Sequence, residues 1–245
     1  MYWYKCWSEL RARVLLGVAA MAAACIGIVY YQHPMRFQSD EPVTYATYIW
    51  KAVYNSFGRD LFVILTIVLA SGGLMQERAL KTLGFTLALP VSRRRAIAVR
   101  AAVGYLGVVA MALTPAVVIP LMSPYVGMQY AAPQAMKFSL LFACTGAAIY
   151  GVAYLTSYFM EGEYLAMLVT IPALMVYVTL LQLPWLNRVP MLDIFHVMNG
   201  EDMPFFNETQ HLITGPMPWL TLAVMLVVAG CLVVAACRRM DEKDL

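Results

Sequence analysis

The amino-acid sequence predicts an all-α membrane protein whose chain crosses the bilayer six times. Of its 245 residues, 62% are hydrophobic and only 13% are charged, whereas a soluble domain is usually about 45–50% apolar and about 25% charged. Six apolar runs each approach the roughly 20 residues that a spanning helix needs. Because backbone polar groups in lipid must be paired within their own segment, we expect these runs to be helical. Six spans use nearly the whole chain and leave no room for a soluble catalytic domain.

The predicted elements form a single transmembrane domain over residues 1–245. It consists of an N-terminal interfacial helix over 1–12, spans over about 14–31, 54–74, 96–122, 138–159, 164–183 and 219–236, and a long outer segment over 184–218. In the interfacial helix, Trp3, Trp7 and Leu10 share one face at helical spacing, which is typical of a helix lying in the headgroup region. The alternative is a frayed tail with chance aromatic residues.

The distribution of basic residues predicts the orientation. With the N-terminus in the cytoplasm, twelve of the 17 Lys and Arg residues fall in inner segments and five in outer segments. The positive-inside rule therefore favours both termini in the cytoplasm and an even number of spans. The connection between the fourth and fifth spans carries no basic residue, only Glu161 and Glu163. We predict a multi-pass protein of the cell inner or plasma membrane.

The inner segment between the second and third spans carries the most information. Leu80, Leu83 and Leu87 recur at helical spacing, so residues 77–89 predict a short amphipathic cytoplasmic helix. Pro90 disfavours its continuation, and Ser92 can cap the third span. An exposed apolar face of this kind needs a partner, either lipid headgroups or another protein.

This segment resembles the signature of type-2 ABC exporter permeases. In that family a glutamate-bearing segment ends the second span, and a T-L-x-x-L-x-x-L-P-V-S-R-R stretch leads into the third. The matching positions here are Glu77, Thr82, Leu83, Leu87, Leu89, Pro90, Val91, Ser92, Arg93 and Arg94. The motif lies within 25 residues, QERALKTLGFTLALPVSRRRAIAVR. The layout of interfacial helix, six spans, long outer segment and charged tail is similar over nearly the whole chain.

The resemblance implies that this segment is a coupling helix that docks on a separate ATPase subunit. The docking residues would be Glu77, Leu80, Leu83, Phe85, Leu87, Leu89 and Pro90. Arg93, Arg94 and Arg95 either contact that subunit or only fix the topology, and the second interpretation is favoured. Two permease chains, identical or different, would work with two ATPase subunits. ATP and Mg are expected on the partner, because this chain has no GxxxxGK[ST] phosphate loop.

No catalytic constellation emerges, so we expect a transporter subunit and not an enzyme, with no cofactor or metal of its own. There is no HExxH or GxSxG motif, and no basic–aromatic pattern predicts nucleic-acid binding. His33, His196 and His211 fall in outer segments without a complete ligand set. Arg59 and Asp60 either line a translocation path or lie at the outer interface, which is the favoured interpretation.

The resemblance thus predicts the permease subunit of an ATP-driven ABC exporter, and the apolar spans favour an apolar or amphipathic cargo. An ATP-independent carrier or channel is one alternative, and a non-transporting membrane assembly protein is another. A carrier would be expected to hold ionisable groups at mid-membrane, and few are evident in the apolar runs.

Overall fold

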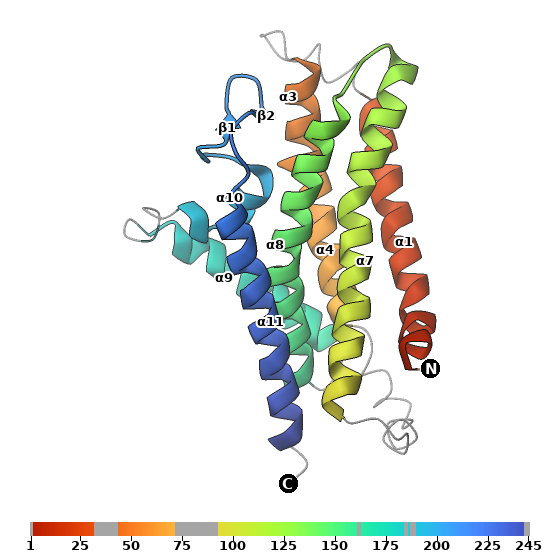
Figure 1. Cartoon of the computed structure of the whole chain (residues 1–245), viewed down its shortest axis with the longest axis vertical. Coiled ribbons are helices and arrows are strands. Elements are labelled where there is room, and N and C mark those ends of the chain that lie inside the picture. The colour runs from red at the N-terminus through yellow and green to blue at the C-terminus, as the bar shows by residue number, and fades with distance from the viewer. Residues whose placement is uncertain are drawn as a thin grey trace.

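The computed structural model describes residues 2–31, 44–71, 93–160, 163–183, 186 and 190–242. In this part of the chain, six helices are long and apolar enough to cross a membrane, which confirms the predicted fold class. The elements, labelled in Figure 1, are α1 (Tyr2–Tyr30), α3 (Tyr45–Ile49), the π-helix η1 (Trp50–Tyr54), α4 (Phe57–Ser71), α7 (Arg93–Met122), the 3₁₀-helix η2 (Ser123–Val126), α8 (Ala132–Phe159), α9 (Glu163–Leu181), the 3₁₀-helix η3 (Pro190–Leu192), α10 (Ile194–Asn199), β1 (Phe206–Asn207), β2 (Leu212–Ile213) and α11 (Trp219–Glu242).

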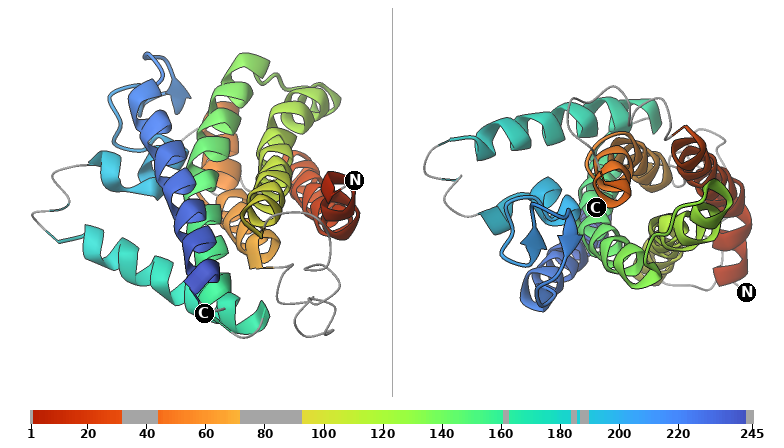
Figure 2. Two further views of the ribbon diagram at one scale, coloured as in Figure 1. Left: turned by 60° about the horizontal axis from the view of Figure 1, so that its bottom comes forward. Right: turned by 90° about the horizontal axis from the view of Figure 1, so that it is seen from above.

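The described N- and C-terminal ends of the chain lie at the same end of the helical bundle (Figure 1). Helix α4 runs towards that end of the bundle, and α7 begins there (Figure 1). Five spans run side by side, whereas α9 crosses the bundle obliquely and is seen lengthwise from above (Figure 2). The bounds of the third to sixth predicted spans agree with those of helices α7, α8, α9 and α11 to within six residues.

The first span differs from its prediction, because α1 is one continuous helix. Its 29 residues join the predicted interfacial segment to the span without a break. Trp3 and Trp7 are exposed, whereas Leu10, which lies next to them on the helix, is buried together with Cys6. The boundary between the packed and exposed sides of α1 therefore runs through the face that the three residues share. That the first turns lie at the membrane surface stays a prediction.

The second span begins nine residues earlier than predicted, at Tyr45. The Thr44 side chain caps α3 by accepting a bond from the backbone N–H of Thr47. Tyr45 then bonds the Ser123 hydroxyl at 2.7 Å, and Trp50 Nε1 donates to the carbonyl of Asn199 at 2.9 Å. These contacts with distant segments stabilise the first turns of the second span. Because several residues there are polar, the sequence did not predict that the span begins at Tyr45.

The π-helix η1 interrupts this second span. Such bulges are rare and are often found at functional sites. Close packing after the bulge needs a glycine at position 58, since a Cβ there would lie 2.4 Å from the carbonyl oxygen of Val53. The chain bends at Asn55 and Ser56 before α4 continues.

Helix α8 forms the axis of the core. It packs against α4, α7 and α11, and small residues let neighbouring helices approach closely, as is common between helices in membranes. A Cβ on Gly146 would lie 2.8 Å from the Phe62 ring, and one on Gly151 would lie 3.2 Å from the Cα of Ala229. Nearer the outer segment, the Tyr54 and Phe138 rings stack at 4.4 Å.

The outer segment folds into a short helix, α10, and a two-stranded antiparallel hairpin, β1–β2. Gln134 and Lys137 of α8 both donate to the carbonyl oxygen of Ile213, at 3.1 and 2.8 Å, and so fix the hairpin to the bundle. Helix α10 packs against α8. The predicted long outer segment therefore has defined structure over residues 190–218.

Candidate functional site

The predicted coupling helix lies outside the described residues. This applies to all of its predicted docking residues, namely Glu77, Leu80, Leu83, Phe85, Leu87, Leu89 and Pro90. Their role therefore stays a prediction. The three arginines that follow start α7, and the side chains of Arg94 and Arg95 are exposed on its first turn.

The first turns of α7 are bound to two neighbouring helices. Arg100 is only 4% exposed, and its Nη2 lies 2.9 Å from Oε2 of Glu9 on α1. Tyr154 of α8 donates its hydroxyl to the carbonyl of Ile97 at 3.0 Å, and Tyr158 donates to Tyr154 at 3.0 Å. We call Glu9, Ile97, Arg100 and Tyr154 the α7 anchor. From the sequence, Arg100 was only one of the twelve basic residues of the predicted inner segments, and its burial was not predicted.

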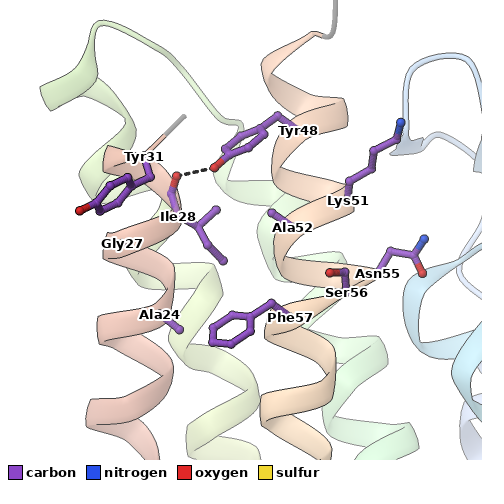
Figure 3. Close-up of a pocket in the computed structure, with 10 residues that line it drawn as sticks. All are labelled: Ala24, Gly27, Ile28, Tyr31, Tyr48, Lys51, Ala52, Asn55, Ser56 and Phe57. Atoms are coloured by element: carbon purple, nitrogen blue, oxygen red, sulfur yellow. Dashed lines mark hydrogen bonds between the residues drawn. The ribbon is translucent and has the colours of Figure 1, made fainter. Parts of the chain in front are cut away.

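A groove of about 870 Å³ runs between α1 and the α3–η1 part of the second span (Figure 3). Its lining is mainly apolar, with Ala24, Gly27 and Ile28 on α1. The Tyr48 hydroxyl bridges the groove by donating to the carbonyl of Ile28 at 2.8 Å. Lys51 points away from α1 in Figure 3. This groove thus has few polar side chains that could bind a polar ligand.

A second cavity, of about 520 Å³, lies between α4 and α9. We call it the α4–α9 cavity. Its apolar walls come from both helices and consist of Val63, Ile64, Ile67, Ile171, Leu174, Met175 and Val178. Its rim is charged and polar and consists of Arg59, Asp60, Asp193, His196 and Glu201. An apolar pocket with a few convergent polar groups is the usual form of a small-molecule site.

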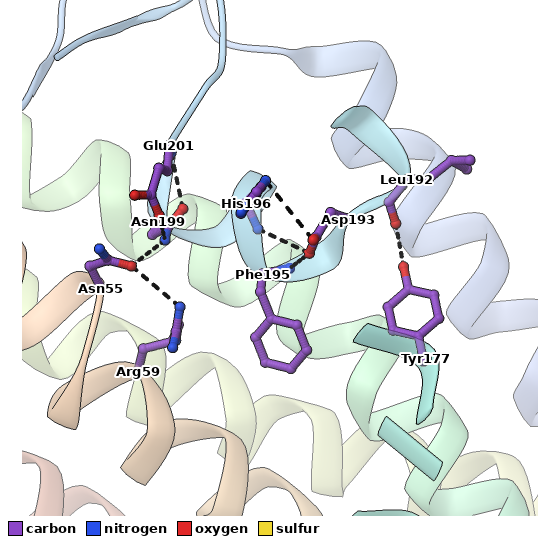
Figure 4. Close-up of polar contacts among 9 residues, drawn as sticks. All are labelled: Asn55, Arg59, Tyr177, Leu192, Asp193, Phe195, His196, Asn199 and Glu201. Carbon is purple, nitrogen blue, oxygen red and sulfur yellow. Dashed lines mark hydrogen bonds and ion pairs between the residues drawn. The ribbon is translucent and has the colours of Figure 1, made fainter. Parts of the chain in front are cut away.

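A hydrogen-bond network joins the rim of this cavity to the bend after η1 (Figure 4). Asn199 Nδ2 donates to Asn55 Oδ1 at 2.5 Å and to Glu201 Oε2 at 3.1 Å. Arg59 Nη1 donates to the same Asn55 oxygen at 3.3 Å. The bend in the second span is therefore linked to the end of α10 by the hydrogen bond between the side chains of Asn55 and Asn199.

Helix α10 is fixed above the cavity at its other end. Asp193 caps the helix, with Oδ1 accepting from the backbone N–H of Phe195 at 2.8 Å and of His196 at 3.2 Å. The Arg59 guanidinium lies 5.6 Å from the centre of the Phe195 ring, within the range of a cation–π contact. The Tyr177 hydroxyl of α9 donates to the carbonyl of Leu192. Helices α4, α9 and α10 thus enclose one site.

Arg59 and Asp60 lie farther from the start of the second span than the sequence predicts, because the helix begins earlier. Their location at the outer interface of the membrane stays a prediction. Arg59 lies 14 residues beyond Tyr45, where the span begins, or about 20 Å along a helix. Both residues line the α4–α9 cavity. The sequence could not show this, because the other three rim residues, Asp193, His196 and Glu201, come from a distant part of the chain.

His33 lies outside the described residues, and the other two outer histidines, His196 and His211, have different partners. His211 Nδ1 is 3.1 Å from the Thr47 hydroxyl, and its ring lies 4.5 Å from that of Trp50. Burial, reinforced by the Lys51 charge, lowers the pKa of His211, although Glu201 and Glu208 act in the opposite sense. Nδ1 of His196 lies 3.9 Å from Asp193. Over the described ranges, no group of three His, Cys, Asp or Glu side chains could hold a metal ion.

No protein-family model matches this sequence, and no curated protein gives a significant match.

Proposed function

We propose that this chain is the membrane-spanning permease subunit of an ATP-driven ABC exporter. The observation that carries the proposal is the stretch at residues 77–94, which resembles the coupling segment of type-2 permeases. Support comes from the six helices able to span a membrane. Further support is that α4 runs towards the end of the bundle where both chain termini lie, and that α7 begins there (Figure 1).

The α7 anchor suggests how force on the coupling segment would enter the bundle. Helix α7 follows that segment directly, and Arg100 lies about two turns from its first residue. A displacement of these turns would act on α1 through the Arg100–Glu9 pair and on α8 through the Tyr154–Ile97 bond. Changing a two-state transporter from 1:99 to 99:1 takes about 5.5 kcal/mol of differential binding, which ATP on the partner subunit would supply.

The working unit would contain two permease chains and two ATPase subunits. In this arrangement residues 77–90 dock on the ATPase from the cytoplasmic side, and the exposed Arg94 and Arg95 follow them on the first turn of α7. ATP and Mg bind only to the partner, and cargo that is apolar or amphipathic passes through the permease chains.

An ATP-independent carrier is the second candidate, and one observation favours it. Carriers hold ionisable groups at depth in the membrane, and Arg59 and Asp60, which follow the start of the second span at Tyr45 by 14 and 15 residues, line a cavity. Transport in vesicles that contain this chain alone distinguishes the two. Cargo movement without an ATPase subunit would support the carrier and overturn the exporter.

Co-purification with the ATPase subunit tests the exporter proposal. We expect Leu83→Asp and Leu87→Asp each to abolish recovery of an ATP-hydrolysing complex, because a carboxylate would be buried in the docking contact. Ala88→Asp is the matched control, since it adds the same charge next to Leu87 on a different face of the predicted helix. Unchanged recovery with both leucine variants would contradict the proposal.

A further inference from the structure

The α4–α9 cavity has two apolar walls that face each other. Val63, Ile64 and Ile67 recur at helical spacing on α4, and Ile171, Leu174, Met175 and Val178 do so on α9. Ile64 is 51% exposed and Met175 is 65% exposed, so these side chains border open space. The volume of about 520 Å³ falls within the range of small-molecule sites, about 300–1,000 Å³.

The rim of the cavity carries an excess of negative charge. Three carboxylates, from Asp60, Asp193 and Glu201, face one guanidinium, from Arg59. With His196 neutral, two negative charges remain. Arg59 is already engaged by the Asp60 carboxylate at 3.1 Å, by Asn55 and by the Phe195 ring. The Asp60 side chain stays 61% exposed and can accept a further positive partner.

We propose that the α4–α9 cavity binds an amphipathic organic cation. The apolar body of the molecule lies between the facing walls of α4 and α9, and its positive head lies among the rim carboxylates. Charge complementarity selects a cation over an anion of the same shape. This inference rests on the proposed function, because it names the cargo class of the permease.

A pair of probes with matched shape tests the charge preference. Tetraphenylphosphonium and tetraphenylborate have nearly the same size and shape and opposite charge. Binding of each is measured by equilibrium dialysis against the full chain in phosphatidylcholine nanodiscs, with protein-free nanodiscs to correct for partition into lipid. We expect saturable binding of the cation near one per chain, and binding of the anion at least about tenfold weaker.

Substitutions in the cavity then test its location. Met175→Trp fills the space between the walls, and we expect it to weaken cation binding about tenfold. Leu168→Trp is its control, because Leu168 is 66% exposed on the same helix and does not line the cavity. Asp60→Asn combined with Glu201→Gln removes the two excess charges, and we expect a similar loss. Glu208→Gln, on the exposed hairpin loop, should leave binding unchanged.

Each variant is accepted only if its thermal unfolding temperature stays close to that of the wild type, and Met175→Phe replaces Met175→Trp if the latter fails to fold. Equal affinities for the two probes would overturn the inference, as would wild-type binding in both the cavity and the charge variants. The assay needs no ATPase subunit. If the docking experiment contradicts the exporter proposal, the result of the binding assay is unaffected. If the cation does not bind, this inference is overturned, but the proposal that residues 77–90 dock on an ATPase is unaffected.

Discussion

Helices α8 and α9 are consecutive and both are apolar enough to span a membrane, yet their surroundings differ. In the most apolar stretch of each helix, 83% of α8 is buried within the protein but only 22% of α9. Their hydropathies do not predict this difference. Composition selects the helices that enter a bilayer, whereas small residues and aromatic contacts decide which of them forms the core.

The two regions to which we assign proposed functions differ in the same way. Helix α8 holds the α7 anchor through Tyr154 and belongs to the closely packed part of the bundle. Helix α9 leaves space against α4 and lines a cavity. In the proposed exporter, the tightly packed helices would transmit force, and the boundary with the loosely packed helix would bind cargo.

Removing a buried ring from α8 should have the largest effect. Phe142 is fully buried between the Tyr54 and Phe62 rings, so Phe142→Ala should lower the free energy of unfolding by about 3–5 kcal/mol. Val176→Ala is the comparison on α9, where the side chain is 58% exposed, and should cost less than about 1 kcal/mol. Chemical unfolding in detergent measures both. Similar losses would show that the contrast between the helices is wrong.

Adding a side chain to the core should have the next largest effect. Gly146→Val would press against Phe62 and Val108 and should destabilise by about 1–3 kcal/mol. Gly230→Val on α11 is the matched control, since nothing lies within 4 Å of the added Cβ. Thermal unfolding of the two variants gives the comparison. A Gly230 variant as unstable as the Gly146 variant would refute the packing around α8.

Breaking the α7 anchor should have a moderate effect on stability. Glu9→Gln removes the charge opposite the buried Arg100, which should cost about 1–3 kcal/mol. Lys5→Gln removes the charge of the more exposed pair with the same glutamate, at 3.8 Å, and should cost less than about 1 kcal/mol. Unfolding in detergent again measures the difference. Equal losses of unfolding free energy in the two variants would show that the pair with the buried Arg100 is no more stabilising than the exposed pair.

The smallest expected effect is a pH dependence of the outer hairpin. Because the pKa of His211 is lowered in the folded protein, the unfolded state binds the proton more readily below about pH 6.5. Stability should therefore fall by less than about 1 kcal/mol between pH 7.5 and pH 5. His211→Asn removes this contribution and suits the positive φ of 52°. The test is the pH dependence of unfolding temperature, and identical profiles for both proteins would exclude His211.

The sequence predicted most of the fold, because span length and composition suffice for it. Spans three to six agree closely with the helices, while the start of the second span was missed. Lys51 and Asn55 interrupt its apolar run, and only contacts such as that between Trp50 and Asn199 reveal a helix from Tyr45. For the same reason Arg59 was predicted to lie closer to the start of the span.

The α4–α9 cavity could not be predicted from the sequence for a different reason. Its rim joins Arg59 to Asp193, His196 and Glu201, residues that no local periodicity connects. The hydrogen bond from Asn199 to Asn55 likewise joins positions 144 residues apart. By contrast, the coupling segment was found from a local motif, and its position in the fold stays a prediction.

Side-specific labelling of residue 83 tests the central proposal most directly. In a chain whose five cysteines are replaced by alanine, Leu83→Cys is exposed to a membrane-impermeant maleimide in sealed vesicles of either orientation, with Glu208→Cys as the external control. The account predicts that position 83 reacts only in inside-out vesicles and position 208 only in right-side-out vesicles. Reaction of position 83 in right-side-out vesicles would contradict it, because a coupling helix outside the cell cannot reach an ATPase in the cytoplasm.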